Sequence, residues 1–152
     1  TPVFLCGGLT MAAFTLSETD WAHDAPRLAA IRRNVFIEEQ GVPEDLEWDE
    51  HDAAAVHLLA ISADGLPIGC ARLLPDGHVG RMAVLAAWRG RGVGQALLLS
   101  AQDAARARGH VLLKLSAQTH AAGFYARAGF AAVGEAYEEA GIPHIAMQKP
   151  LV

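Results

Sequence analysis

Cysteine is scarce in this sequence, which contains two among 152 residues, Cys6 and Cys70. They form no CxxC pair and no framework of repeated spacings, so a fold held together by disulfides is not expected. A reducing compartment, the cytoplasm, is the simplest location for such a chain.

Long hydrophobic runs and basic blocks are also missing. No apolar run approaches the roughly 20 residues that a membrane-spanning helix needs, so we expect no integral membrane protein. The net charge is -5 and no lysine-rich block occurs, which argues against nucleic acid as a partner.

Two nucleotide-binding motifs and a metal motif are absent as well. The chain has no GxxxxGK[ST] sequence, and the spacing of Gly90, Gly92 and Gly94 is not GxGxxG. A P-loop NTPase and a dinucleotide-binding turn are therefore not expected. His51 and His57 flank acidic residues without zinc-ligand spacing, so we expect no metal.

What is present indicates one globular domain. The 152 residues are 52% hydrophobic and 19% charged, which is ordinary for a chain that buries a single core. Residues 1–10 lack the basic start of a signal peptide, and Met11 looks like a natural beginning. We expect residues 1–10 to be a leader, tag remnant or frayed end, and residues 11–152 to form the domain.

Hydrophobic periodicity predicts both strands and helices. Leu28, Ile31 and Val35 recur at helical spacing, and Asp64-Gly65 is a hairpin signal. Helices are expected at residues 20–40, 95–108 and 119–128, and strands at 12–16, 56–62, 68–74, 78–84, 111–117, 131–137 and 144–148. This order predicts an α/β (α+β) fold in which helices pack on one mixed sheet.

The most informative stretch is the glycine-rich run from Arg89 to Gly94, between a predicted strand and a predicted helix. The first N–H groups of a helix lack internal partners and lie at its positive end, so they can bind an anion. Glycine lets the backbone approach the ligand, and Arg89 and Arg91 add charged donors. The pattern is typical of a site for a phosphorylated ligand; a tight connection with solvated arginines is the alternative.

The same run, Arg89-Gly90-Arg91-Gly92-Val93-Gly94, resembles the R/Q-x-x-G-x-G/A motif of the GNAT acetyltransferase superfamily. AAGFYARAGFAAVGE, residues 121–135, is similar to the second signature of that superfamily, and residues 32–52 and 139–147 resemble its ElaA-like branch. The resemblance implies a single mixed, mostly antiparallel β-sheet with a central parallel pair, flanked by helices.

The resemblance also implies acetyl-CoA as cosubstrate. The amides of residues 90–95 would hold its pyrophosphate, the backbone of residues 82–84 would pair with its pantetheine arm, and Gln118 takes the place of an Asn that many family members carry. The cofactor-binding candidates are Met82, Ala83, Val84, Arg89, Gly90, Arg91, Gly92, Val93, Gly94, Gln95 and Gln118.

Acetyl transfer to an amine needs a neutral nucleophile and a proton for the departing thiolate. The resemblance makes Tyr125 the candidate acid, with a core aromatic as the alternative. Glu39, in a stretch that resembles ElaA-like chains, is the first choice for the base. His144 and His78 are further candidates, and a solvated glutamate is the structural alternative.

An acidic segment places six carboxylates around Trp48 between residues 44 and 52. These charges could attract a cationic amine, to which the indole would add a cation-π contact, although a solvated loop would show the same composition. Glu38, Trp48 and His144 are the substrate-binding candidates.

The sequence thus predicts a cytoplasmic N-acetyltransferase that moves the acetyl group of acetyl-CoA directly to a primary amine of a small molecule or peptide. An acyl-CoA-binding or regulatory module of the same fold, without catalysis, is the alternative. A nucleotide-binding protein is disfavoured because the phosphate-loop Lys is missing. Family members often dimerise, so a homodimer is compatible with this reading.

Overall fold

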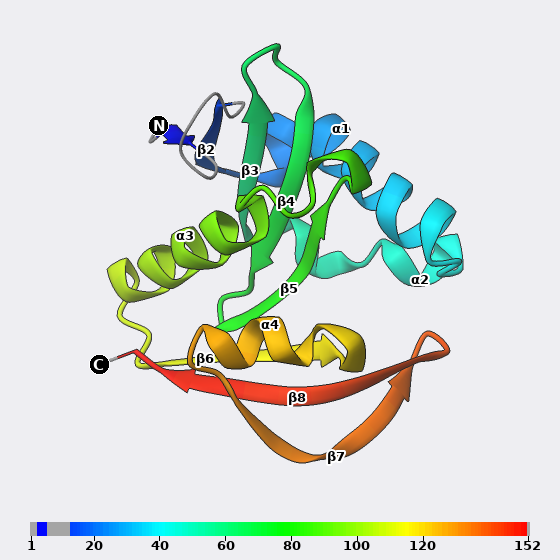
Figure 1. Ribbon diagram of the computed structural model, residues 1–152, viewed down its shortest axis with the longest axis vertical. Coiled ribbons are helices and arrows are strands. Elements are labelled where there is room, and N and C mark those ends of the chain that lie inside the picture. Colours follow the sequence, from blue (N-terminus) through cyan, green and yellow to red (C-terminus); the bar gives the residue numbers. More distant parts are fainter. Residues whose placement is uncertain (1–2, 6–12, 152) are drawn as a thin grey trace.

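The computed structural model describes residues 3–5 and 13–151, whose strands form one sheet in the order β1-β2-β3-β4-β5-β6-β8-β7 (Figure 1). Described strand pairs are antiparallel, except that β5 and β6 run parallel near the middle of the sheet. The predicted fold class is confirmed. The strands are β1 Val3–Leu5, β2 Ala13–Thr19, β3 Val56–Ser62, β4 Pro67–Leu73, β5 His78–Val84, β6 Leu112–Gln118, β7 Ala131–Glu139 and β8 Ile142–Pro150.

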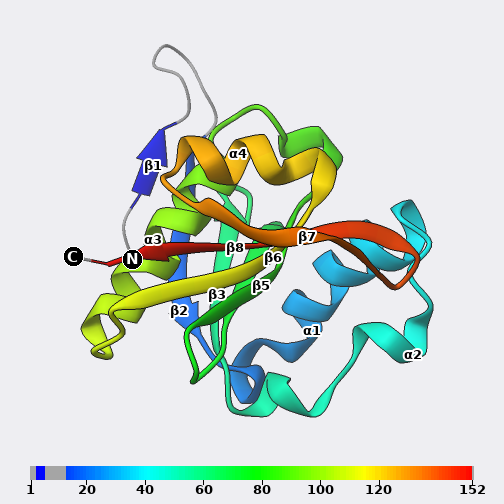
Figure 2. The same cartoon turned by 90° about the horizontal axis from the view of Figure 1, so that it is seen from below.

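Helical elements lie on both faces of this sheet (Figure 2). They are α1 Trp21–Arg32, the π-helix η1 Arg33–Glu39, α2 Glu44–Glu47, α3 Val93–Ala107, α4 Ala122–Arg127 and the 3-10 turns η2 Glu50–Ala53, η3 Ala86–Trp88 and η4 Thr119–Ala121. Among the described residues, no helix is both long and apolar enough to cross a bilayer.

Alternating side chains of the central strands build two hydrophobic clusters, one on each face. Leu58 of β3 packs with the α3 side, whereas the next residue, Leu59, packs with Leu28 and Ile31 of α1. This is the period of two expected of a strand that is buried on both faces. Burial of one leucine side chain contributes about 1.5–3 kcal/mol to folding.

Close packing of α3 on β4 depends on Gly69. A Cβ atom at Gly69 would lie 3.0 Å from side-chain atoms of both Leu97 and Val93, so these side chains would have to shift by a few tenths of an ångström. The glycine therefore allows the start of α3 to lie directly on the sheet beside β5.

The predicted elements occur where they were expected, with some local differences. The helix predicted over residues 20–40 continues as a π-helix from Arg33, and the acidic segment contains the turns α2 and η2. The prediction of a leader at residues 1–10 lies largely outside the described residues. Its described part, Val3–Leu5, pairs with β2.

Two irregularities shape the middle of the sheet. The strands β5 and β6 pair only at His78 with Lys114 and at Val79 with Leu115, and they separate beyond these positions. The register of β4 with β5 also shifts between Cys70 and Arg72, at a bulge in which Arg81 has φ 47. Such bulges bend a strand and are frequent near functional sites.

Candidate functional site

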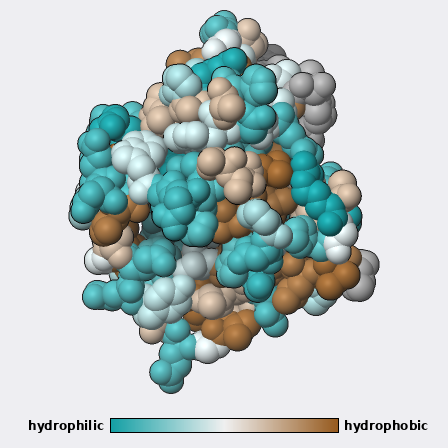
Figure 3. All heavy atoms as spheres, turned by 180° about the vertical axis from the view of Figure 1, so that it is seen from behind, coloured by the Kyte–Doolittle hydropathy of each residue, from teal (hydrophilic) through white to brown (hydrophobic). Residues whose placement is uncertain are grey.

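A groove of ≈ 1230 Å³ opens where β5 and β6 separate. It is lined by residues of η1, β5, β6, β8, α4 and the start of α3. Seen from behind, the molecule is mainly hydrophilic, and apolar side chains show between its upper and lower parts (Figure 3). The groove is large enough for an extended ligand of several hundred daltons.

The start of α3 forms one end of this groove. Gly92 is the N-cap with φ 84, no side chain caps the helix, and the first i to i−4 backbone bond runs from Ala96 N to Gly92 O, 3.0 Å. The amides of residues 93–95 consequently have no partner inside the helix. Gly90, with φ 75, also lines the groove. Free amides at the positive end of a helix fit a phosphate group.

Arg89 lies beside this turn, and its guanidinium is already engaged. It donates to both carboxylate oxygens of Glu39, at 2.7 and 2.6 Å, and to the Val84 carbonyl at 2.9 Å. The hydrogen bonds from Arg89 lower the pKa of Glu39. The predicted base is therefore an ionised carboxylate with both oxygens occupied, which weakens its ability to take a proton.

Tyr125 lines the groove from α4. Its hydroxyl donates to the Met82 sulfur at 3.6 Å, and its ring makes edge contacts with Phe124 and Phe130. Burial raises the pKa of Tyr125 to about 12. The phenol thus keeps its proton at neutral pH, as an acid for a leaving group must.

The opposite wall of the groove contains amide and imidazole groups. The side chains of Gln118 and Gln40 exchange two hydrogen bonds, at 2.8 and 3.2 Å, which join β6 to the end of η1. His120 contacts the Gln118 oxygen at 2.6 Å. His144 is buried on β8 and also lines the groove.

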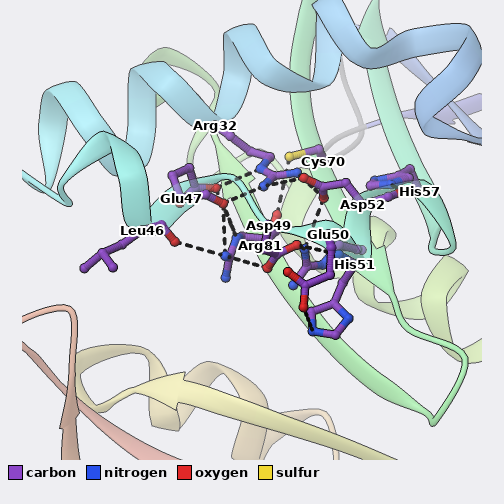
Figure 4. A network of polar contacts seen from close by, with 11 residues as sticks. Arg32, Leu46, Glu47, Asp49, Glu50, His51, Asp52, His57, Cys70 and Arg81 are labelled. Atoms are coloured by element: carbon purple, nitrogen blue, oxygen red, sulfur yellow. Dashed lines mark hydrogen bonds and ion pairs between the residues drawn. The ribbon is translucent and has the colours of Figure 1, made fainter.

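The acidic segment is fastened to the sheet by arginines (Figure 4). Arg32 donates to Glu47 and Asp52, both at 2.8 Å, while Arg81 donates to the Glu47 carbonyl at 3.0 Å and to Asp49 at 3.1 Å. These carboxylates are therefore paired inside the protein, and they do not form a free acidic surface.

Arg72 completes this network, which the sequence reasoning missed. It donates to Asp49 at 2.8 Å and to Asp52 at 3.1 Å. Burial opposes ionisation of Asp49, but the hydrogen bond from Arg72 and the nearby arginine charges outweigh it and lower the pKa of Asp49. The sequence signal that could have revealed the network is the presence of an arginine in the helix and in two strands that flank the acidic segment in the chain, Arg32, Arg72 and Arg81.

Three predicted site residues lie outside the groove lining. Trp48 packs its ring against the guanidinium groups of Arg32 and Arg33, at 5.1 and 5.7 Å. Arg91 lies over the Trp88 ring at 5.0 Å, and Glu38 is exposed. Every other predicted catalytic, cofactor-binding or substrate-binding residue lines the groove.

Within the described part of the chain, no three His, Cys, Asp or Glu side chains are grouped as a metal ion would require. Cys70 is buried beneath the bulge, where its thiol donates to the Arg81 carbonyl at 3.4 Å. Burial raises the pKa of Cys70 to about 12, so its reactive thiolate form is disfavoured.

Comparison with known proteins gives the class of protein that carries this groove. The family model described as acetyltransferase (GNAT) domain matches residues 22–151. The chain therefore belongs to the GNAT acetyltransferase family.

The relatives agree with this assignment. Protein ElaA of Escherichia coli is 34% identical over 133 residues, which cover 82% of this chain and 86% of ElaA. The crystal structure of E. coli ElaA has a TM-score of 0.79 at 30% identity and covers 90% of this chain and 99% of its own. An acyl-CoA N-acyltransferase from Pseudomonas aeruginosa has a TM-score of 0.79 at 32% identity, with coverage of 90% and 99%. The resemblance to the ElaA-like branch is confirmed.

Proposed function

We propose that this protein is an N-acetyltransferase that transfers the acetyl group of acetyl-CoA directly to a primary amine. The observation that carries the proposal is one groove lined both by the uncapped start of α3 and by Tyr125, whose pKa burial raises to about 12. Family membership supports acyl transfer as the reaction class.

Acetyl-CoA fits this groove in two ways. The free amides at the start of α3 suit its pyrophosphate. Beyond Val79, none of the described strands pairs with the edge of β5 that faces β6. The peptide groups of Met82, Ala83 and Val84 can therefore hydrogen-bond the amides of the pantetheine arm as another strand would.

Tyr125 acts in this proposal as the general acid for the thiolate of CoA. A direct transfer needs no enzyme nucleophile, and buried Cys70 offers a poor one. Glu39 can act as the base only if the bound pyrophosphate draws Arg89 away from it. A cytoplasmic location, a homodimer and a single domain over residues 11–152 remain predictions.

An acyl-CoA-binding module without catalysis is the second candidate. The observation that favours it is the pair of Glu39 with Arg89, because both oxygens of the expected base are engaged. Such a module would bind CoA at the same helix start but would release no thiol.

Two measurements on the full chain separate these functions. Calorimetric titration with CoA tests binding, and a thiol-release assay with acetyl-CoA and a panel of small amines, polyamines and peptides tests transfer. Amine-dependent thiol release supports the enzyme. Binding without release supports the module, and the absence of CoA binding contradicts both.

A further inference from the structure

A row of polar side chains crosses β6, β8 and β7 at the groove. The strand register places His144 of β8 opposite both Gln118 of β6 and Tyr137 of β7. Directly opposite residues of antiparallel strands project to the same face. The hydroxyl of Tyr137 also hydrogen-bonds Ser116, two residues before Gln118.

The ring of His144 is held in one tautomer. Its Nδ1 lies 2.6 Å from the carbonyl oxygen of Ile142. A carbonyl oxygen only accepts hydrogen bonds, so Nδ1 must carry the proton. In the neutral ring the other nitrogen, Nε2, therefore has a free lone pair.

A carboxylate and an aromatic ring lie next to the His144 imidazole. A carboxylate oxygen of Glu139 lies 3.8 Å from Nε2, too far for a hydrogen bond but close enough to stabilise an imidazolium ion. The Tyr137 ring stacks on the imidazole at 6.2 Å between centroids. Other ionisable groups of the groove lining include His120, Arg127 and the Glu39 carboxylate, which is paired with Arg89.

Tyr125 and His144 approach the groove from opposite faces of the sheet. Tyr125 packs with the hydrophobic cluster on the α3 side, whereas Ile142, two residues before His144, packs with the cluster on the α1 side. An amine and a thioester that meet in the opening between β5 and β6 would therefore have the acid on one side and the imidazole on the other.

From this geometry we infer that His144 is the general base of the reaction and accepts the ammonium proton of the acceptor at Nε2. Glu139 is a positioning residue that stabilises the protonated ring, and the Ile142 carbonyl fixes the tautomer. The inference rests on the proposed function. It assigns the acceptance of the amine proton to His144, because both carboxylate oxygens of Glu39 are engaged by Arg89.

The acceptor ammonium gives one proton to Nε2, and the neutral nitrogen attacks the thioester carbonyl to form the C–N bond. When the C–S bond breaks, sulfur takes the electron pair and the Tyr125 proton, and the second nitrogen proton restores Tyr125 through water. His144 then releases its proton, so the products are the amide, CoA thiol and one proton.

The test compares His144→Asn with wild type on two acceptors from the amine panel, one strongly basic and one weakly basic enough to be neutral at the assay pH. For the strongly basic amine, we expect kcat/KM to fall about 10²- to 10⁴-fold. We also expect the loss of the acid limb of the pH profile, because an asparagine side chain cannot take up the proton. For the neutral amine the loss should be at least tenfold smaller, because its first proton is already gone.

Two further variants complete the experiment. His51→Asn, on the exposed turn η2, should leave both activities unchanged. Glu139→Gln, whose side chain is exposed, should fold normally and move the acid limb to lower pH, because the imidazolium loses its neighbouring negative charge. This second variant tests the inference even if His144→Asn does not fold.

The outcomes distinguish failure of the proposed function from failure of the His144 assignment. If wild type releases no thiol with any amine, the proposed function fails. If wild type is active but folded His144→Asn loses activity equally on both amines, or keeps the acid limb, the assignment of His144 is overturned. An unmoved limb in Glu139→Gln also overturns it.

Discussion

Among the single residues, Tyr125 is buried in a way that suits a proton donor. We expect Tyr125→Phe to lower kcat about 100-fold or more, with little change in the KM for acetyl-CoA, because the ring contacts remain and only the proton is lost. Burial raises the pKa of Tyr125 to about 12, so the phenol stays protonated up to about pH 10. In wild type, thiol release measured from pH 7 to about 10 should therefore not fall through loss of the Tyr125 proton.

A Tyr125→Phe variant with unchanged kcat over that pH range would show that the residue is a packing aromatic. The hydroxyl contacts a sulfur atom at 3.6 Å, a weak acceptor. The substitution should therefore alter stability only slightly, which a thermal melt can check.

Residue types could be predicted from the sequence, but their pairing could not. The glycine run and Tyr125 were identified from local motifs, and the structure brings them to one groove. The pair of Glu39 with Arg89 joins residues 50 positions apart, and no local pattern contains that information. The sequence of the acidic segment is compatible with a solvated loop or with one that attracts a cationic amine, because its arginine partners are distant in the chain.

Among the elements, the start of α3 depends on backbone that glycine alone adopts easily. We expect Gly92→Ala to weaken CoA binding roughly tenfold, because a left-handed conformation costs other residues about 1–2 kcal/mol. The free variant would relax from φ 84, and CoA would have to restore the turn. Calorimetric titration measures this change.

A matched control lies in the hairpin between β3 and β4. Gly65 has φ 85 and open space around it, but it does not line the groove. Gly65→Ala should lose stability in the same way and keep its affinity for CoA. Equal loss of affinity in both variants would mean that general destabilisation, and not the helix start, controls binding.

The positions of the elements were accessible from the sequence because hydrophobic periodicity is local. The strand predicted at residues 56–62 is observed with the same bounds. The π-helix has no local sequence signal, and the bulge at Arg81 was not accessible because this residue contacts a distant segment of the chain. Arg81 is tied to Glu47 and Asp49, which lie on another segment of the chain. These irregular elements border the groove, as expected where function competes with regular structure.

At the scale of the whole molecule, buried ion pairs fasten the acidic segment to α1 and to the sheet, and the segment contributes Glu47 and Asp49 to the groove lining. Arg32 is 1% exposed and bonds Glu47 and Asp52. Breaking a buried ion pair typically costs about 3–5 kcal/mol, and Arg32→Met would remove Arg32 from both carboxylates, which would keep only Arg81 and Arg72 as partners. Because domains are stable by about 5–15 kcal/mol, we expect a large fall in the urea midpoint of unfolding.

Arg33, the next residue in the chain, provides a matched control for Arg32→Met. Arg33 forms an exposed pair with Glu44, at 2.9 Å, so Arg33→Met should cost at most about 1 kcal/mol. The difference between the two variants should shrink on acidification, since burial raises the pKa of Glu47 and its protonation removes one of the negative charges that Arg32→Met leaves with fewer partners. Equal midpoints at neutral pH would show that the segment is held by packing alone. A lower midpoint for Arg32→Met, with loss of CoA binding, would show that the buried pairs also shape the groove.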